Sequence, residues 1–227
     1  MSQGRSAATF LPATTTLGAL RKAAGSCRGC DLYKRATGTV FGEGPETAEI
    51  VFVGEQPGDQ EDRSGHPFVG PAGHLLDRAL KEARLRRDQV YVTNAVKHFK
   101  WLPLGKRRKH VKPSMREVEA CRPWLDAEIS TIQPKLVVCL GSTAAQAMFD
   151  RPVGIERERG TFQETPGGVT ALVTIHPSAI LRFPDPDQRE LEYARFLKDL
   201  SLVQEWVLHR HTEEPRTKRS TPHSDPR

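Results

Sequence analysis

The chain has 227 residues, of which 37% are hydrophobic and 27% charged, and its formal net charge is +6. This composition supports a buried core and excludes wholesale disorder, and no apolar run approaches the roughly 18 residues that a membrane-spanning helix needs. Because the N-terminus also lacks a secretory signal pattern, we expect a monomeric, cytoplasmic protein that contacts no membrane and forms no disulfides.

Strands and helices alternate along the chain between two polar ends. We expect helices at residues 16–24, 71–85, 113–132, 142–149 and 187–207, and strands at residues 49–54, 89–94, 135–141 and 169–175. In the third helix, Ser114 and Glu117 have the spacing of a capping box, whereas Pro123 predicts a kink or a break. This alternation predicts an α/β fold, a three-layer α/β/α sandwich around a central four-stranded, mostly parallel sheet. The expected single domain covers residues 15–208, with a disordered N-terminus (1–14) and a disordered basic tail (209–227).

The loop after the first strand, residues 54–73 (GEQPGDQEDRSGHPFVGPAG), is rich in glycine and proline. It places Glu55, Gln56 and Asp59 just beyond the strand and Phe68 just before the next helix. It matches neither a Walker loop nor a dinucleotide fingerprint. The residues indicate a functional loop at the carboxyl end of the sheet, where α/β folds bind ligands, and a purely structural glycine loop is the alternative.

Two other strands end in polar residues at the same edge. The second strand ends at Asn94, whose amide can both donate to and accept from a ring edge, although a lone Asn there is also a common turn residue. The fourth strand runs into His176, Pro177 and Ser178. Together these groups predict a site at this edge of the sheet.

The segment of residues 97–112 (KHFKWLPLGKRRKHVK) holds seven of the 34 basic residues and no acidic one. The rest of the chain has 27 basic and 28 acidic residues, so the positive excess lies in this segment. Such a block indicates a polyanionic partner, most simply a nucleic acid, with a solvated basic loop as the alternative.

The four cysteines form one tight pair, Cys27 and Cys30, and two dispersed thiols, Cys121 and Cys139. This spacing fits a zinc site and an iron–sulfur cluster about equally, and two free buried cysteines are a third reading. Cys139 is the least secure ligand because a cysteine in the strand VVCLG can simply belong to the core.

The motifs GEQPGDQED, PFVGPAG, YVTNAVKHFK, ACRPWL, LGSTAAQAM and HPSAILR occur in an order that resembles the uracil-DNA glycosylase superfamily. The chain is similar to the iron–sulfur branch, which includes the family 4 enzymes and the UdgX group, over roughly residues 27–202. GEQPG and the inserted KRRKH (residues 106–110) are most like UdgX, although the stretch WLPLG before KRRKH is shorter than expected. The resemblance implies the superfamily's α/β fold and a [4Fe-4S] cluster held by the four cysteines.

The resemblance also implies roles for the residues at the sheet edge. Glu55, Gln56 and Asp59 would line the catalytic pocket, in which Gln56 would also contact the base. Phe68 would stack on the extruded uracil, Asn94 would read its polar edge, and His176 would stabilise charge on its O2. In UdgX the histidine of the KRRxH loop becomes attached to the deoxyribose C1′, and here that position is His110.

Our leading hypothesis from the sequence is therefore excision of uracil from DNA followed by covalent, single-turnover capture through His110. An ordinary family 4-like glycosylase with turnover is the alternative, and a non-catalytic iron–sulfur DNA-binding module is a third reading. We expect DNA phosphates to contact a set of polar residues comprising Lys106, Arg107, Arg108, Lys109 and Ser178. The same loop cations would keep His110 neutral. Phe99 and Trp101 would stack on unpaired bases and favour single-stranded DNA, or would serve as loop anchors.

Overall fold

The computed structural model describes residues 6–213 and contains a five-stranded sheet in the order β2-β1-β5-β7-β6. The strands are β1 (Ile50–Gly54), β2 (Val90–Asn94), β5 (Leu136–Leu140), β6 (Phe162–Glu164) and β7 (Thr170–Thr174). All neighbours pair in parallel except β6, which is antiparallel to β7. The four expected strands are all present, but the sheet has a fifth strand, β6. The expected number of four was wrong because β6 is a three-residue edge strand without an apolar run.

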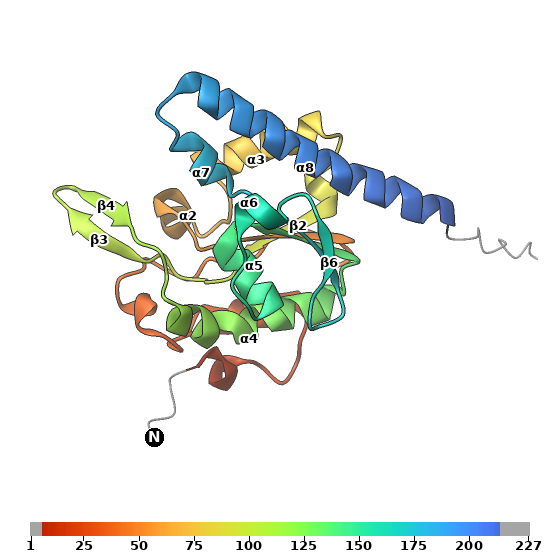
Figure 1. Cartoon of the computed structure of the whole chain (residues 1–227). Helices are drawn as coiled ribbons and strands as arrows, with labels where there is room; N and C mark the ends of the chain where they lie inside the picture. The colour runs from red at the N-terminus through yellow and green to blue at the C-terminus, as the bar shows by residue number, and fades with distance from the viewer. Residues whose placement is uncertain (1–5, 214–227) are drawn as a thin grey trace, which may run out of the picture.

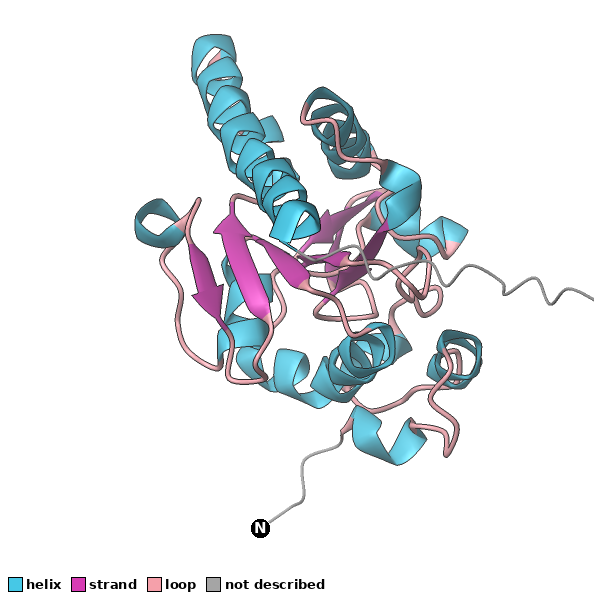
Figure 2. Ribbon diagram, turned by 90° about the vertical axis from the view of Figure 1, so that its right-hand side faces the viewer, coloured by secondary structure: helices cyan, strands magenta, loops and turns pink. Residues whose placement is uncertain are grey.

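Helices cover both faces of the sheet, so the three-layer α/β/α architecture is confirmed (Figures 1 and 2). One face packs against α1 (Leu17–Ala24), α4 (Met115–Ile132) and α5 (Ser142–Phe149). The other face packs against α3 (Pro71–Glu82), α7 (Pro177–Leu181) and α8 (Pro186–Glu213). Side chains alternate along each strand, so Val51 and Val53 enter the first cluster while Ile50 and Phe52 enter the second.

Shorter elements occupy the connections. Two short α-helices, α2 (Asp59–Ser64) and α6 (Ile155–Glu158), follow β1 and α5, and three 3-10 turns lie at η1 (Ala7–Phe10), η2 (Asp31–Lys34) and η3 (Arg87–Gln89). The capping box of α4 is present, since Glu117 N–H donates to Ser114 Oγ at 3.4 Å and Ser114 N–H donates to Glu117 Oε2 at 2.6 Å. The predicted break at Pro123 was wrong. The helix continues because Trp124 and Leu125, directly after the proline, are fully buried against the core.

The basic segment is a hairpin rather than an irregular loop. Strands β3 (Trp101–Leu104) and β4 (Arg107–His110) pair antiparallel and extend from the body of the protein (Figure 1). Gly105 takes the first of the two turn positions with a φ of +58°, which favours glycine. Trp101 pairs directly with His110, the last residue of β4, and His110 lies at the edge of the sheet where the predicted site was expected.

The ordered structure extends beyond the expected domain limits. Ala7 is buried, and the 3-10 turn that contains it packs against α4. Helix α8 continues past His209 to Glu213, whereas we expected the tail to begin at residue 209. The other residues of the predicted disordered ends, 1–5 and 214–227, lie outside the described range. No helix among the described residues is long and apolar enough to cross a membrane.

Candidate functional site

Three predicted site residues converge on the last residue of β1, Gly54. A Cβ built on Gly54 would lie 2.4 Å from Asn94 Oδ1, 2.8 Å from Phe68 Cζ and 3.4 Å from His176 Nε2. These side chains also line a cavity of about 380 Å³ at the carboxyl end of the sheet. Glycine is therefore required at this position, because any side chain there would occupy the point at which the three groups meet.

Phe68 has an unusual backbone conformation that is packed against the start of α3. It has a φ of +57°, an uncommon conformation for an aromatic residue, and its carbonyl oxygen would lie 1.8 Å from a Cβ on Gly73. Gly73 thus allows the first turn of α3 to pack directly on this carbonyl. The Phe68 ring is buried and stacks with the His176 ring at a centroid distance of 6.3 Å and an interplanar angle of 25°.

Asn94 presents a free amide to the cavity. The residue is 3% exposed, and within residues 6–213 its side chain makes no hydrogen bond to protein. Its backbone carbonyl accepts a hydrogen bond from Lys97 Nζ at 2.8 Å. Lys97 is fully buried and its ammonium also pairs with Glu128 at 2.5 Å, so a buried ion pair supports the end of β2 beneath Asn94.

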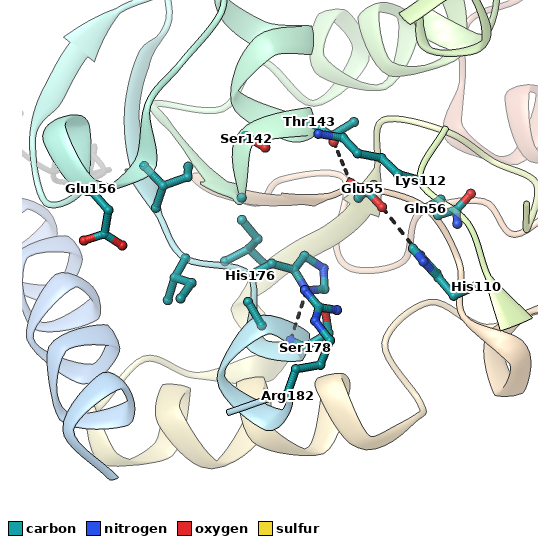
Figure 3. Close-up of a pocket in the computed structure, with 15 residues that line it drawn as sticks. Glu55, Gln56, His110, Lys112, Ser142, Thr143, Glu156, His176, Ser178 and Arg182 are labelled. Atoms are coloured by element: carbon teal, nitrogen blue, oxygen red, sulfur yellow. Dashed lines mark hydrogen bonds and ion pairs between the residues drawn. The ribbon is translucent and has the colours of Figure 1, made fainter. Parts of the chain in front are cut away.

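His176 is a neutral hydrogen-bond donor. Its Nδ1 accepts from the backbone N–H of Ser178 at 3.1 Å, which leaves the proton on Nε2, the atom that faces Gly54 (Figure 3). Burial, with smaller contributions from the nearby Arg182 and His110, lowers the pKa of His176 to about 4. The imidazole is therefore uncharged at neutral pH and directs an N–H into the cavity.

A second cavity of about 400 Å³ adjoins the first and shares His110 and His176 with it. Figure 3 shows Glu55 in this cavity, with one carboxylate oxygen accepting from Thr143 Oγ1 at 2.6 Å and the other 3.5 Å from His110 Nε2. Burial lowers the pKa of His110; Glu55 opposes this shift and Arg182 adds to it. The cation that favours neutral His110 is thus Arg182, not the loop cations we expected.

Gln56 supports the hairpin instead of offering its amide to a base. Its Nε2 donates to the carbonyl oxygens of Lys100 at 3.3 Å and Val111 at 3.0 Å, and its Oε1 accepts from Lys100 N–H at 3.0 Å. Lys100 and Val111 flank the two strands of the hairpin, so this side chain fixes the position from which His110 extends. Gln56 lines both cavities, but its amide is already used by protein groups.

Arg108 and Asp59 pair with each other, which differs from the roles predicted for them. Arg108 forms ion pairs with Asp59 and, at 2.5 Å, with Asp62, and its guanidinium lies 5.4 Å from the ring centres of both Phe99 and Trp101. Its side chain is 13% exposed, so it is an internal anchor and not an available phosphate ligand.

The residues around Arg108, namely Asp59, Phe99 and Trp101, also have other contacts within the protein. Burial would raise the pKa of Asp59, but hydrogen bonds from Arg63 and Arg108 outweigh burial and lower it. Asp59 is therefore an ionised partner of two arginines at the margin of the first cavity. Phe99 is buried, and Trp101 donates from Nε1 to the Arg35 carbonyl at 2.9 Å. Both aromatic residues therefore act as anchors of the hairpin, the alternative to stacking on unpaired bases.

The other hairpin cations are exposed. Lys106, Arg107 and Lys109 have no ion-pair partner in the described part of the chain, in contrast to Arg108. Ser178 lines both cavities, and its hydroxyl accepts from Arg182 at 3.1 Å. Sequence reasoning missed Arg182 and Thr143, although both lie in motifs that carry the resemblance (HPSAILR and LGSTAAQAM).

All four cysteines are buried as free thiols on the α1–α4 face of the sheet. Two sulfurs accept hydrogen bonds at 3.2 Å, Cys27 Sγ from Trp124 Nε1 and Cys121 Sγ from the Lys97 N–H. Burial is the main cause that raises the pKa of Cys121 to about 12; Lys97 opposes this shift, and the neighbouring Cys30 and Cys27 add to it. No group of three or more metal-ligating side chains is close enough to hold a single ion within residues 6–213. Buried thiols with N–H donors are the donor chemistry that iron–sulfur clusters use.

Comparisons with known proteins agree with this geometry. The family model of the uracil DNA glycosylase superfamily matches residues 41–201. A type-4 uracil-DNA glycosylase of Archaeoglobus fulgidus is 42% identical over 166 residues, which cover 70% of this chain and 80% of the relative. A type-4 uracil-DNA glycosylase of Thermotoga maritima is 41% identical over 157 residues (69% and 78%), and a type-5 uracil-DNA glycosylase of Pyrobaculum aerophilum is 29% identical over 154 residues (60% and 64%). The chain therefore belongs to the uracil-DNA glycosylase superfamily.

Proposed function

We propose that the protein excises uracil from DNA by cleaving the N-glycosidic bond and that it turns over in the manner of a type-4 uracil-DNA glycosylase, in the service of base excision repair. The observation that carries this proposal is the convergence of Asn94, Phe68 and His176 on Gly54. A stacking ring, an unpaired amide and a neutral N–H donor are what an extruded pyrimidine requires. The two type-4 relatives support turnover over the single-turnover capture that we favoured from the sequence.

In this proposal the base enters the cavity above Gly54. Extrusion costs a few kcal/mol, which stacking on Phe68 and hydrogen bonds to Asn94 would offset. The Asn94 amide can accept from uracil N3–H while it donates to O4, and no protein group competes for it in the described structure.

Departure of the base develops negative charge on uracil and positive charge on the sugar. His176 would donate from Nε2 to uracil O2, and its low pKa keeps a neutral donor in place without a change in protonation. Glu55 lines the adjoining second cavity, where its carboxylate would stabilise the sugar cation and orient the water that attacks C1′ (Figure 3).

The DNA strand would pass over the hairpin. Lys106, Arg107 and Lys109 are exposed cations of the hairpin whose last residue, His110, borders both cavities, and they would contact phosphates on either side of the flipped nucleotide. We propose single-stranded DNA as the preferred substrate because it does not require base pairs to open before extrusion.

We also propose that the buried cysteine site holds a [4Fe-4S] cluster. The support is four buried thiols on one face of the sheet, with N–H groups donating to two of them. When bound, the cluster would act as a structural centre that ties the N-terminal segment to α4. Trp124 and Lys97 would orient the sulfur atoms and stabilise their negative charge.

Covalent capture by His110 is the second candidate, and the position of this residue favours it. His110 borders both cavities and is 3.5 Å from Glu55, and its lowered pKa keeps it neutral. A ring-nitrogen lone pair would form the bond to C1′, and the C1′–N1 bond would break with its electron pair going to uracil. The ring proton would pass to Glu55, which leaves a neutral imidazole on the sugar.

A single experiment separates the two candidates. The protein is incubated with an end-labelled single-stranded oligonucleotide that contains one uracil, and the products are resolved on a denaturing gel with and without alkali. Turnover predicts alkali-labile abasic DNA in excess of enzyme and no shifted band. A stoichiometric band that resists denaturation, and that His110→Ala abolishes, would establish the covalent reaction. Intact oligonucleotide in both lanes would exclude uracil excision altogether.

A further inference from the structure

The hairpin of β3 and β4 has an anchored face and an outer face. Directly paired residues of an antiparallel ladder point to the same side, and side chains alternate along each strand. The register therefore puts Arg108 and His110 on the anchored face, which is held by the ion pair of Arg108 with Asp62. The outer face consists of Leu102 opposite Lys109 and Leu104 opposite Arg107.

The outer face combines exposed apolar groups with exposed cations. Leu102 is 50% and Leu104 is 60% exposed. Single exposed apolar residues are common on protein surfaces, but a pair of them on a projecting hairpin indicates a contact surface. Arg107 and Lys109 opposite them are exposed and have no ion-pair partner among the described residues, and residues 97–112 include no acidic side chain. The outer face therefore fits a partner that offers both apolar surface and negative charge.

The outer face begins next to the candidate site. His110 borders both cavities, and the pair of Leu102 and Lys109 is the next pair along the ladder. The pair of Leu104 and Arg107 lies two residues further along the strands, roughly 7 Å away. A DNA strand that delivers a nucleotide to the cavities would therefore meet the outer face with nucleotides close to the extruded one.

Leu102 also lines a cavity of about 230 Å³ that the hairpin shares with η2. Leu32 and Val111 contribute apolar surface to it, and its acidic residue, Asp31, pairs with Lys34 at 2.8 Å. The cavity thus adds apolar surface beside Leu102, against which the face of a base can pack.

Single-stranded nucleic acid matches this combination of groups. Its phosphates and the faces of its bases are both accessible, whereas in a duplex the base faces are stacked inside. Leucine is one of the apolar residues that proteins insert between bases. A second copy of the chain fits less well, because it would bring the unpaired cations of two hairpins together.

We propose that the outer face of the hairpin is a second binding subsite, in which Leu102 and Leu104 contact the bases next to the uracil while Arg107 and Lys109 hold the phosphates between them. This inference rests on the proposed excision of uracil from single-stranded DNA, and it gives the preference for single strands a physical cause. Burial of the exposed half of one leucine is worth about 3- to 10-fold in affinity, so the two leucines together should supply about 10- to 100-fold.

The test measures binding of the full-length protein to two labelled single-stranded oligonucleotides by fluorescence anisotropy. Both carry a central uracil nucleotide that resists cleavage. In the first the flanking nucleotides have thymine bases, and in the second the three nucleotides on each side are abasic, so the two differ in bases but not in phosphates. Wild type should bind the first oligonucleotide at least about 10-fold more tightly than the second.

Two double variants separate base contacts from phosphate contacts. Leu102→Ser with Leu104→Ser should remove the difference between the oligonucleotides and keep the salt dependence of binding. Arg107→Gln with Lys109→Gln should reduce the salt dependence and keep the difference. The matched control is Leu191→Ser with Leu208→Ser, which alters two leucines of α8 that are each 55% exposed and should bind both oligonucleotides as wild type does.

Three results would overturn the subsite. The first is equal affinity of wild type for the two oligonucleotides, and the second is a leucine variant that keeps the difference. If that variant also changes from dimer to monomer in sedimentation, the outer face is a contact between copies of the chain. The third is a leucine variant that binds both oligonucleotides more weakly by the same factor, because the leucines would then act through the shape of the hairpin.

The single variant Leu104→Ser keeps the test decisive if the double variant does not fold, and it should reduce the difference by about 3- to 10-fold. Uracil release from a cleavable oligonucleotide is measured on the same proteins. Absence of release in wild type would refute the proposed excision, whereas the anisotropy comparison decides the subsite separately.

Discussion

Substitution of Gly54 by alanine should block the base site while the fold is kept. The added methyl group would lie 2.4 Å from Asn94 Oδ1 and 2.8 Å from Phe68 Cζ, closer than real Cβ contacts allow. Overpacking of this kind costs about 1–3 kcal/mol. Because the methyl group occupies the space of the base, we expect it to weaken substrate binding by this amount. We therefore expect kcat/KM for uracil release to fall at least about 5- to 150-fold.

The matched control is Gly18→Ala, since a Cβ on Gly18 in α1 meets no atom within 4 Å. This variant should release uracil at the wild-type rate and gain a little stability from better helix propensity. Both variants are compared with wild type in a steady-state uracil-release assay and by thermal unfolding. Folded Gly54→Ala that acts at the wild-type rate would mean that the base does not bind above Gly54.

Three further outcomes follow from the same geometry. Burial lowers the pKa of His176 from 6.5 to about 4 in the folded protein. As the pH falls from 6.5 to 4, the unfolded chain therefore takes up a proton at this histidine before the folded protein does, and the free energy of unfolding decreases over this pH range. Urea unfolding should show wild type losing up to about 3 kcal/mol more than His176→Asn between these pH values, and parallel pH profiles would refute the buried neutral ring. Lys97→Met should cost about 3–5 kcal/mol in urea unfolding, because the Glu128 carboxylate stays buried without its cation, and a loss below about 1 kcal/mol would contradict the ion pair. The double variant Arg107→Gln and Lys109→Gln should reduce the slope of log affinity against log salt for single-stranded DNA by about 1.4, and an unchanged slope would show that the exposed hairpin cations do not contact phosphate.

The positions of the site residues could be predicted because parallel strands end at one edge of a sheet. Asn94 and His176 follow apolar strands in the sequence, and in the structure they meet at Gly54. Their protonation and pairing could not be predicted, because these depend on contacts such as Ser178 N–H on His176 Nδ1.

The basic segment shows the limit of a charge count. The sequence identifies four consecutive cations but not which of them is compensated, and the partners of Arg108, Asp59 and Asp62, lie more than 40 residues away in the chain. The hairpin itself was missed because its strands are short and mostly exposed, with no alternation of buried residues. Gln56 was assigned to the base for a related reason, since only the fold shows that the hairpin ends use its amide.

The central claim is tested most directly by the amount of free uracil released per protein molecule. Single-stranded DNA containing uracil is supplied in large excess and the free base is quantified by chromatography over time, with a thymine oligonucleotide of the same sequence as control. We expect many moles of uracil per mole of protein, no thymine, and strong loss of release in His176→Asn. Release that stops at one equivalent would contradict turnover, and release that is absent or equal for both bases would contradict uracil excision by this site.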